Sequence, residues 1–338
     1  MKQLLSIWLQ HQWYQRSPWQ ILLRPFAWLF WLLSSLRRQA YRLRLFKSTR
    51  LPVPVIVVGN ISVGGTGKTP FVIWLVDQLQ QQGWRPGIVS RGYGGDVVHT
   101  QQVDEKSLPE VVGDEPALLA QRTGVPLFVG RKRSRAARHL LQQYPQCNLI
   151  ITDDGLQHYA LERDIEIAIV DGEREFGNGQ LLPAGPLREL PSRLNEMDAV
   201  VFNSAAPAAG AYLMQFVPGK LHLLQEPAKQ IDIADFINEF KGQRVHAVAG
   251  IGHPQRFFNQ LELLGLSIVP HAFPDHHAYT PQDLQFAAGE PVIMTEKDAV
   301  KCVTFAQSDW WFMPISAEID RALMDKIQTL LASLQYKE

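Results

Sequence analysis

Residues 55–70 read VIVVGNISVGGTGKTP, and this stretch determines the expected fold. The β-branched run at 55–58 predicts a buried strand, the glycines predict a tight turn, and Lys68-Thr69 predicts the start of a helix. In such a turn backbone N–H groups converge on phosphate oxygens, and the helix N-terminus adds partial positive charge. Ser62 stands where the common G-x-x-x-x-G-K-[ST] pattern has its first glycine, but the strand–loop–helix context outweighs this departure. The predicted nucleotide-binding residues are Gly64, Gly65, Thr66, Gly67, Lys68 and Thr69.

A phosphate loop of this kind needs an acidic element for its metal ion, and residues 148–155 (NLIITDDG) provide one. An apolar strand there ends in Asp153 and Asp154. In a parallel sheet the carboxyl ends of the strands meet at the ligand crevice. By itself Asp-Asp-Gly is more often an ordinary turn. Beside a phosphate loop it predicts that Asp153 and Asp154 bind Mg²⁺ together with the Thr69 hydroxyl.

The pattern on both sides of the loop alternates short apolar runs with helical stretches, which predicts an α/β fold with a largely parallel sheet flanked by helices. The expected strands are 53–58, 87–90, 127–129, 149–152, 165–170 and 199–202, and the expected helices 69–82, 114–122 and 132–144. Residues 204–230 are rich in alanine and contain three prolines, which weakens the pattern and indicates a domain junction.

A second, smaller α/β unit is expected from about Val245. Its predicted strands are 246–249, 291–295 and 311–314, with helices at 255–264 and from about 317 to the end. The expected organisation is therefore an N-terminal helical region at 1–49, a core domain at 50–225 and a smaller domain at 226–338.

The N-terminal region differs sharply from the rest of the chain in charge. Residues 1–50 contain nine Lys or Arg and no acidic residue, although the whole chain has 33 residues of each sign. Five of the nine tryptophans also lie there. Net charge near zero therefore hides a basic, aromatic-rich end. The two cysteines lie far apart, which argues against a disulfide framework and favours a reducing compartment.

Four interpretations compete for this basic end. A secretory signal is disfavoured because arginines, not a cleavage site, follow the apolar residues 19–36. A membrane-spanning helix needs about 20 apolar residues, whereas the charge-free stretch 25–36 is shorter. The segment could instead pack on the domain or form a dimer contact. The favoured prediction is an amphipathic helix that lies on a membrane surface, with the arginines attracted to anionic lipid.

Further residues bear on the type of reaction. The segment TEKD at 295–298 is only a weak match to the guanine-specificity motif, so a GTPase is disfavoured relative to a small-molecule kinase. A kinase needs a base near the acceptor hydroxyl. Asp114 is a candidate, although it could simply cap a helix, and the His276-His277 pair could orient such a base or be solvent-exposed. Arg91 could bind a phosphorylated acceptor. Three cations at 131–133 precede a helix, which is unfavourable for its dipole and indicates an anionic partner.

Taken together, these segments resemble the tetraacyldisaccharide 4′-kinase family, the lipid A kinases. The resemblance rests on GNISVGGTGKTP at 59–70, SRGYGG at 90–95, GDEP at 113–116, DDGLQH at 153–158, PAGPLRE at 183–189 and FPDHH at 273–277. Their order and spacing cover nearly the whole chain, and the combination is highly specific. Leu156 stands where the family usually has an aromatic residue, a change that we expect to matter little.

The resemblance implies ATP- and Mg²⁺-dependent phosphorylation of the 4′-hydroxyl of an acylated glucosamine disaccharide 1-phosphate at the cytoplasmic face of the inner membrane. It implies that Asp114 is the general base, tuned by His276, and that Lys68 acts on the transferred phosphate. It also implies that the second domain acts as a lid. The implied substrate-binding residues are Arg91, Tyr93, Gln157, His158, Arg188 and Glu189. The lipid substrate and the membrane surface are the expected partners; no nucleic acid and no obligate protein partner are expected.

Two alternatives from other classes remain. A P-loop GTPase or metal-insertion ATPase that docks on a membrane protein would hydrolyse nucleotide alone or with a protein effector, whereas a kinase needs its lipid acceptor. A non-catalytic nucleotide-binding scaffold would keep full function when Lys68 is replaced by alanine.

Overall fold

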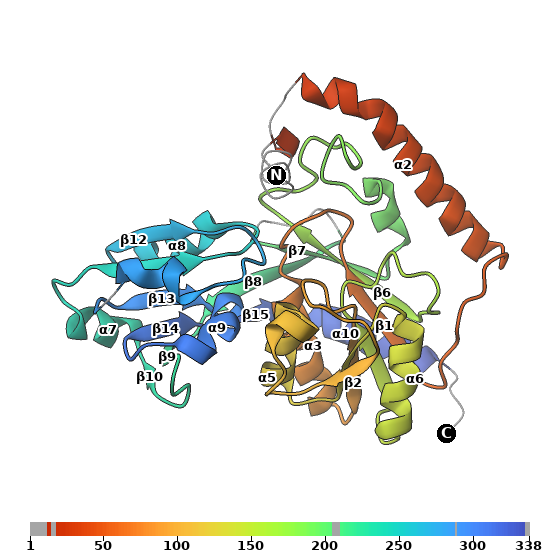
Figure 1. Cartoon of the computed structure of the whole chain (residues 1–338). Coiled ribbons are helices and arrows are strands. Elements are labelled where there is room, and N and C mark those ends of the chain that lie inside the picture. Colours follow the sequence, from red (N-terminus) through yellow and green to blue (C-terminus); the bar gives the residue numbers. More distant parts are fainter. Residues whose placement is uncertain (1–11, 15–17, 205–209, 288, 335–338) are drawn as a thin grey trace.

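The computed structural model describes residues 12–14, 18–204, 210–287 and 289–334 of the 338-residue chain (Figure 1). The phosphate-loop strand β1 (Val55–Gly59) lies in the middle of a nine-stranded sheet with the order β15-β8-β7-β6-β1-β5-β2-β4-β3. All five residues of β1 are buried, as its β-branched sequence predicts for a strand covered on both faces.

The neighbours of β1 run parallel to it, so their carboxyl ends meet at one edge of the sheet. The other parallel strands are β2 (Pro86–Ser90), β4 (Leu127–Val129), β5 (Leu149–Thr152), β6 (Ile165–Asp171), β7 (Ala199–Asn203) and β8 (Tyr212–Pro218). The antiparallel edges are β3 (Gln101–Val103) and β15 (Ile315–Ile319). This arrangement confirms the predicted parallel α/β sheet.

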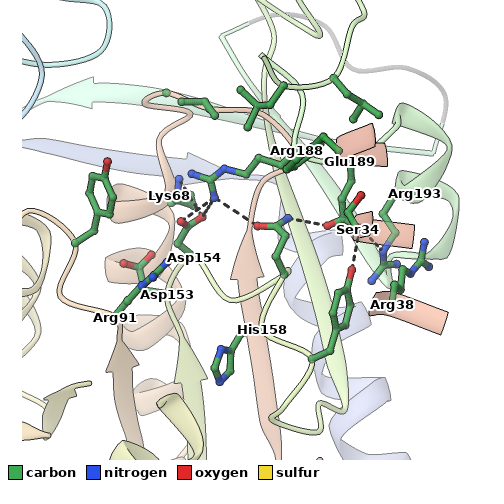
Figure 2. Close-up of a pocket in the computed structure, with 18 of the residues that line it drawn as sticks. Ser34, Arg38, Lys68, Arg91, Asp153, Asp154, His158, Arg188, Glu189 and Arg193 are labelled. Atoms are coloured by element: carbon green, nitrogen blue, oxygen red, sulfur yellow. Dashed lines mark hydrogen bonds and ion pairs between the residues drawn. The ribbon is translucent and has the colours of Figure 1, made fainter. Parts of the chain in front are cut away.

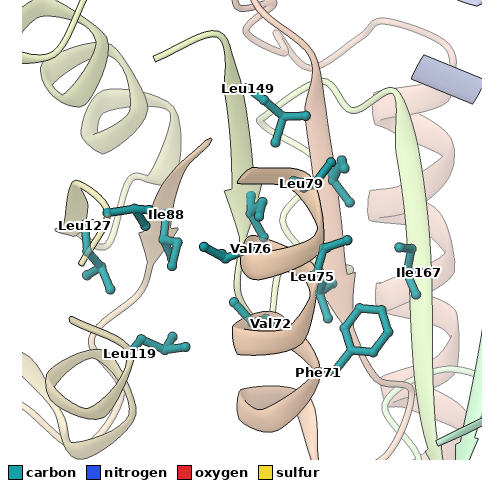
Figure 3. Close-up of a cluster of buried hydrophobic side chains, with 14 of the residues drawn as sticks. Phe71, Val72, Leu75, Val76, Leu79, Ile88, Leu119, Leu127, Leu149 and Ile167 are labelled. Atoms are coloured by element: carbon teal, nitrogen blue, oxygen red, sulfur yellow. The ribbon is translucent and has the colours of Figure 1, made fainter. Parts of the chain in front are cut away.

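Helices cover both faces of this sheet. The larger core cluster joins one face to the apolar sides of α3 (Lys68–Gln81), α5 (Asp114–Thr123) and α10 (Arg321–Ser333). Figure 3 shows Phe71, Val72, Leu75, Val76 and Leu79 of α3 directed into this cluster. On the opposite face α6 (Arg133–Gln143) packs a smaller cluster. The short helix α4 (Pro109–Val112) precedes α5. Burial of α3 holds the helix N-terminus, and with it Lys68, rigidly at the end of β1.

A second sheet of six strands, with the order β10-β9-β14-β13-β11-β12, forms a separate unit (blue and teal in Figure 1). Its strands are β9 (Leu221–Leu223), β10 (Gln230–Ile231), β11 (Val245–Ala249), β12 (Ile268–Ala272), β13 (Val292–Thr295) and β14 (Trp310–Met313). Its helices are α7 (Ile233–Glu239), α8 (Pro254–Leu263) and α9 (Glu296–Cys302), with 3₁₀ turns at Pro281–Ala287 and Val303–Phe305.

The C-terminal part differs from the sequence-based expectation. Residues 315–319 form strand β15 and not the start of a helix, because they pair with β8 at the edge of the large sheet. Helix α10 follows and packs on the large-sheet core. Within the expected junction 204–230, moreover, β8 belongs to the large sheet and β9 to the small one. The second unit is therefore 221–313, enclosed by segments of the first, and differs from the expected range 226–338.

Helix α2 (Trp19–Arg42) runs along the outside of the first unit (red in Figure 1). It buries only Ala27, against Leu181, Ala184 and Leu187, and its Arg38 pairs with Glu196 in the 3₁₀ helix η1 (Pro191–Glu196). No helix in the described part of the chain is long and apolar enough to cross a membrane. Residues 1–11 and 15–17 of the basic end lie outside the described residues. The apolar residues of α2 that lie exposed are Trp19, Ile21, Leu22, Phe26, Trp28, Leu29, Trp31, Leu32, Leu33 and Leu36.

Candidate active site

Two buried asparagines fix the conformation of the phosphate loop. The Asn60 side-chain amide donates to Thr66 Oγ1 at 3.2 Å, and Asn203 at the end of β7 donates to the Thr66 carbonyl at 2.7 Å. Gly67 has φ +83°, and a Cβ there would lie 2.5 Å from the Phe216 ring, so a larger residue is excluded on both grounds. The loop is thus preformed. Sequence reasoning did not single out Asn60 or Asn203, since each looks like an ordinary residue after a strand.

Lys68 is the first residue of α3 and is buried. Its Nζ lies 3.6 Å from Asp154 Oδ1, and Arg188 contacts the same carboxylate at 2.9 and 3.1 Å (Figure 2). Burial alone would raise the pKa of Asp154, but Lys68 and Arg188 outweigh it and hold that pKa well below its ordinary value. Asp154 is therefore ionised, and two cations converge where a nucleotide's terminal phosphates would lie.

Asp153 has a different environment from its neighbour. Burial, reinforced by the charge of Glu115, raises the pKa of Asp153 to about 7. Its Oδ2 accepts a long hydrogen bond of 3.5 Å from Ser90, and its buried Oδ1 has no hydrogen-bond partner among the described residues. A buried carboxylate oxygen without a partner is costly, and a cation would remove that cost. The main chain of Asp153 and Asp154 is fixed by Arg133, whose guanidinium donates to both carbonyls at 3.2 and 2.7 Å.

A carboxylate–imidazole pair lies at the same cavity, which His276 lines together with Asp153 and Asp154. Asp114, the first residue of α5, is only 4% exposed, and both its oxygens lie 2.9 Å from His276 Nδ1. Burial opposes ionisation of Asp114, but the hydrogen bond from His276 and the charge of Lys297 together lower its pKa to about 2. The same hydrogen bond outweighs burial at His276 and raises the pKa of the imidazole. The predicted base and its partner are therefore brought together from different units.

The lowered pKa of Asp114 makes a prediction about stability. The folded-state value of about 2 lies below the value of about 3.9 expected for an unfolded chain. Ionised Asp114 therefore stabilises the fold above about pH 4, and this contribution disappears as the pH falls toward 2. We expect the difference in free energy of unfolding between the wild type and Asp114→Asn to shrink by about 2 kcal/mol over that interval. Urea titrations of both proteins at a series of pH values measure this difference. A difference in free energy of unfolding that stays constant between pH 4 and pH 2 would contradict the prediction.

Most predicted site residues line one cavity of about 960 Å³. Those that line it are Gly64, Gly65, Lys68, Arg91, Tyr93, Asp153, Asp154, Gln157, His158, Arg188, Glu189 and His276. Thr66, Gly67 and Thr69 lie beside the cavity in the loop and α3 but not on its surface, and Asp114 lies behind His276. Helix α2 forms another wall of the cavity, through Phe30, Trp31, Ser34, Ser35, Arg37 and Arg38. The cavity therefore extends from the phosphate loop to the helix with the exposed apolar face.

The region between the phosphate loop and α2 is organised by Glu189. Its carboxylate accepts hydrogen bonds from Gln157 at 2.7 Å and from Tyr159 at 3.0 Å, and Arg193 Nε lies 3.4 Å away (Figure 2). Arg193 is 5% exposed and also pairs with Glu166 at 2.6 Å. Sequence reasoning missed Tyr159 and Arg193, because nothing in the local pattern marks a residue whose partners lie on other elements.

His158 and three arginines form the wall at the ends of β2 and β4. The buried Nε2 of His158 has no hydrogen-bond partner in the part of the chain that the structure describes, and burial together with the charge of Arg133 lowers the pKa of its imidazole to about 4. Arg91, Arg131 and Arg133 line the same part of the cavity. The neutral imidazole beside several cations leaves this wall strongly positive, which suits an anionic ligand.

A parallel sheet with a glycine-rich loop, a buried lysine, aspartates at the next strand end and a carboxylate–imidazole pair at the same cavity defines a P-loop phosphotransferase. Residues 19–332 match the family model described as tetraacyldisaccharide-1-P 4′-kinase, and the chain therefore belongs to this family. The resemblance drawn from the motifs is thereby confirmed.

Similar proteins agree with this assignment. The chain is 67% identical over 338 residues to a tetraacyldisaccharide 4′-kinase of Methylobacillus flagellatus, with 100% of both chains covered. It is 51% identical over 321 residues to one from Azoarcus sp., with 93% of each chain covered. The fold is also similar to a crystal structure of LpxK from Aquifex aeolicus in complex with ATP, with a TM-score of 0.76, 29% identity, and 92% of this chain and 99% of that chain covered.

Proposed function

We infer that the protein transfers the γ-phosphate of ATP to the 4′-hydroxyl of a tetraacylated glucosamine disaccharide 1-phosphate, a step of lipid A biosynthesis. Family membership over residues 19–332 carries this conclusion. The geometry agrees with it, because one cavity joins a phosphate loop to a carboxylate–imidazole pair. ATP as the donor is supported by the ATP complex of the similar Aquifex aeolicus structure.

In the proposed reaction Asp114 accepts the proton of the sugar hydroxyl as that oxygen attacks the γ-phosphorus in line, and the bond from this phosphorus to the β,γ-bridging oxygen breaks to release ADP. His276 orients the Asp114 carboxylate through the 2.9 Å hydrogen bonds. Lys68 balances negative charge that builds up on the phosphate oxygens, and the backbone of Gly64 and Gly65 faces the same space. Arg91, Tyr93, Gln157, His158, Arg188 and Glu189 would hold the acceptor, since they line the cavity between this centre and α2.

The site also suits magnesium. The described residues contain no cluster of three or more His, Cys, Asp or Glu side chains that could hold a metal ion, but Mg²⁺ in kinases is usually bound by one or two carboxylates together with substrate phosphates. The partnerless Asp153 Oδ1 fits that role. We propose that Asp153, Asp154 and the Thr69 hydroxyl would hold the ion. When bound, magnesium would polarise the phosphate oxygens and offset their charge.

We further propose that the protein works at the cytoplasmic face of the inner membrane, attached through α2. A tetraacylated lipid is costly to extract from a bilayer, at about 0.8 kcal/mol for each buried CH₂. The enzyme must therefore approach the bilayer. Helix α2 supports the proposal because ten of its apolar residues lie exposed and one of these, Trp31, also lines the cavity together with Ser34 and Arg38. Its arginines would be attracted to anionic lipid.

The surface attachment predicts a defined effect of Trp28, which is 69% exposed on α2. Burying a large apolar side chain contributes about 1.5–3 kcal/mol. Trp28→Ser should therefore weaken binding to vesicles of phosphatidylethanolamine and phosphatidylglycerol by about tenfold or more, measured by co-sedimentation. Leu263→Ser is the matched control, since Leu263 is 88% exposed but lies on α8 of the second unit. Equal losses in the two variants, or no loss in either, would count against α2 as the membrane contact.

Mass spectrometry of the acceptor tests the proposed function directly. The purified protein is incubated with ATP, MgCl₂ and tetraacyldisaccharide 1-phosphate in mixed micelles, with EDTA in a parallel sample. The expected product carries one additional phosphate on the distal sugar, and EDTA stops its formation. ATP hydrolysis that needs no acceptor, with the lipid unchanged, would instead favour a switch or motor ATPase.

A further inference from the structure

The segment TEKD at 295–298, which sequence reasoning left as a weak nucleotide-specificity motif, lies at the boundary of the two units. Thr295 ends β13 and caps α9, because its Oγ1 accepts from the Asp298 N–H at 3.2 Å. The cap fixes the first turn of α9. Glu296 and Lys297 in this turn reach α5, the helix of the first unit that begins with Asp114.

Three ion pairs between described residues join these helices. Arg122, near the end of α5, donates two hydrogen bonds to Glu296, at 2.8 and 2.6 Å. Near the start of α5, Lys297 Nζ lies 3.1 Å from Glu115 Oε1 and 3.7 Å from Asp114 Oδ2. The first turn of α9 therefore contacts both ends of α5.

Lys297 also contacts the loop that carries the imidazole partner of Asp114. Its Nζ lies 3.3 Å from Asp275 Oδ1, and Asp275 immediately precedes His276. One ammonium thus touches Asp114 from the first unit and Asp275 from the second. His276 has φ +60°, in the left-handed region that few non-glycine residues adopt. The contact between Lys297 and Asp275 helps to hold the loop that contains it.

The burial of Lys297 makes these contacts strong. Its side chain is 17% exposed, and removing an ammonium from water is costly unless carboxylates surround it. Burial opposes protonation, but Glu115, Asp275 and Asp114 outweigh it and raise the pKa of Lys297 above its ordinary value. The positive charge is therefore permanent in neutral solution and stays fixed beside Asp114.

We propose that Lys297 is a positioning residue for phosphoryl transfer, which acts from the second unit by fixing Asp114 and the loop that contains His276 relative to each other. The proposal rests on the function proposed above for Asp114 and goes beyond it by assigning the TEKD segment. Lys297 is placed to act through Asp114, because its Nζ lies 3.7 Å from Asp114 Oδ2 and its other ion pairs are with Glu115 and Asp275. The Glu296–Arg122 pair joins the same two helices at the other end of α5.

The test compares Lys297→Met, which keeps the aliphatic stem and removes the charge, with Lys241→Met, a matched change at an exposed lysine of the second unit. Lys297→Gln is made as well, because its amide can still donate hydrogen bonds to the surrounding carboxylates. For each, kcat and the KM for ATP and for the lipid are measured in mixed micelles, and thermal unfolding gives the Tm.

We expect kcat to fall on the order of 10²-fold in both Lys297 variants, the size of effect that displacement of a catalytic group produces. The KM for ATP should change less than about threefold, because the phosphate loop is untouched. Lys241→Met should match the wild type. A kcat within about threefold of the wild type, or a fall matched by the loss of ATP affinity or of folding, would overturn the proposal.

A second readout needs no substrate. The imidazole of His276 is titrated by NMR in the nucleotide-free protein and is assigned by comparison with His276→Gln. Removing the nearby ammonium should move the pKa of His276 to higher pH in Lys297→Met, because Lys297 lowers it in the wild type. An unchanged titration overturns the proposal. If the wild-type protein does not phosphorylate the lipid, the proposed function fails, and this titration still decides whether Lys297 acts on the pair.

Discussion

Replacing Asp114 by asparagine will lower kcat by about 10²–10⁴-fold, the usual contribution of a general base. The amide keeps the size and one acceptor oxygen of the carboxylate, so the contact with His276 can persist while the proton acceptor is lost. The KM for ATP should change little, because the ion pairs of Asp114 in the described structure are with His276 and Lys297 and not with the phosphate loop. Steady-state kinetics with the lipid acceptor measure both quantities.

Asp77→Asn provides the matched control for this experiment. Asp77 lies on the exposed side of α3, in the same unit as Asp114, and should give wild-type kinetics. A kcat for Asp114→Asn within threefold of that control would remove Asp114 from the role of base. The hydrogen bonds between His276 and Asp114 would then need an explanation other than orientation of a general base.

Lys68→Met should reduce kcat by about 10²–10³-fold, the loss seen when one preorganised charge is removed from a transition state. Methionine keeps most of the buried stem of Lys68 and removes only the charged end, which lies 3.6 Å from Asp154. Part of the loss should also be seen as weaker ATP binding, because the ammonium faces the terminal phosphates in the ground state as well. Calorimetry with ATP and kinetics with the lipid separate the two contributions.

Lys106→Met, at an exposed position of a loop in the same unit, controls for the general effect of losing a lysine. Full activity of Lys68→Met would show that the charge of Lys68 does not stabilise the transition state of phosphoryl transfer. Loss of ATP binding with an unaltered kcat at saturation would mean that Lys68 anchors the nucleotide without acting on the transition state.

The centre of the fold could be predicted from local sequence because its signals are local. The strands β4 and β5 begin and end at the residues that the apolar runs predict, 127–129 and 149–152. Helix α3 begins at Lys68, one residue before the expected start. Each of these elements is fully buried or has one apolar face, so the spacing of its apolar residues in the sequence matches the repeat of the strand or helix that forms.

The failures came from pairings across long sequence distances. Residues 315–319 alternate apolar and polar types over only five positions, and their partner strand β8 lies about a hundred residues earlier. No local signal connects the two segments, so the helical propensity of the following residues extended the predicted helix too far.

The functional site shows the same contrast between local sequence signals, which could be read, and contacts across long sequence distances, which could not. Residues in glycine-rich or acidic motifs at strand ends could be predicted, and most of them line the cavity. Arg193 and Lys297 could not, since an isolated cation in a helix usually faces solvent. Only the folded chain shows that Arg193 meets Glu189 and that Lys297 meets Asp114.

The pairing of Pro218 with Ile315 across β8 and β15 means that the chain leaves the large sheet and returns to it at the same place. The second unit is therefore an insertion into the first, whose nine-stranded sheet contains none of the inserted strands. The first unit carries the phosphate loop and Asp114, and the inserted unit carries His276 and Lys297. A chain without the insertion, with a short turn joining 218 to 315, would keep the phosphate loop that binds a nucleotide and lose His276 and Lys297, the two groups that contact Asp114 from the second unit.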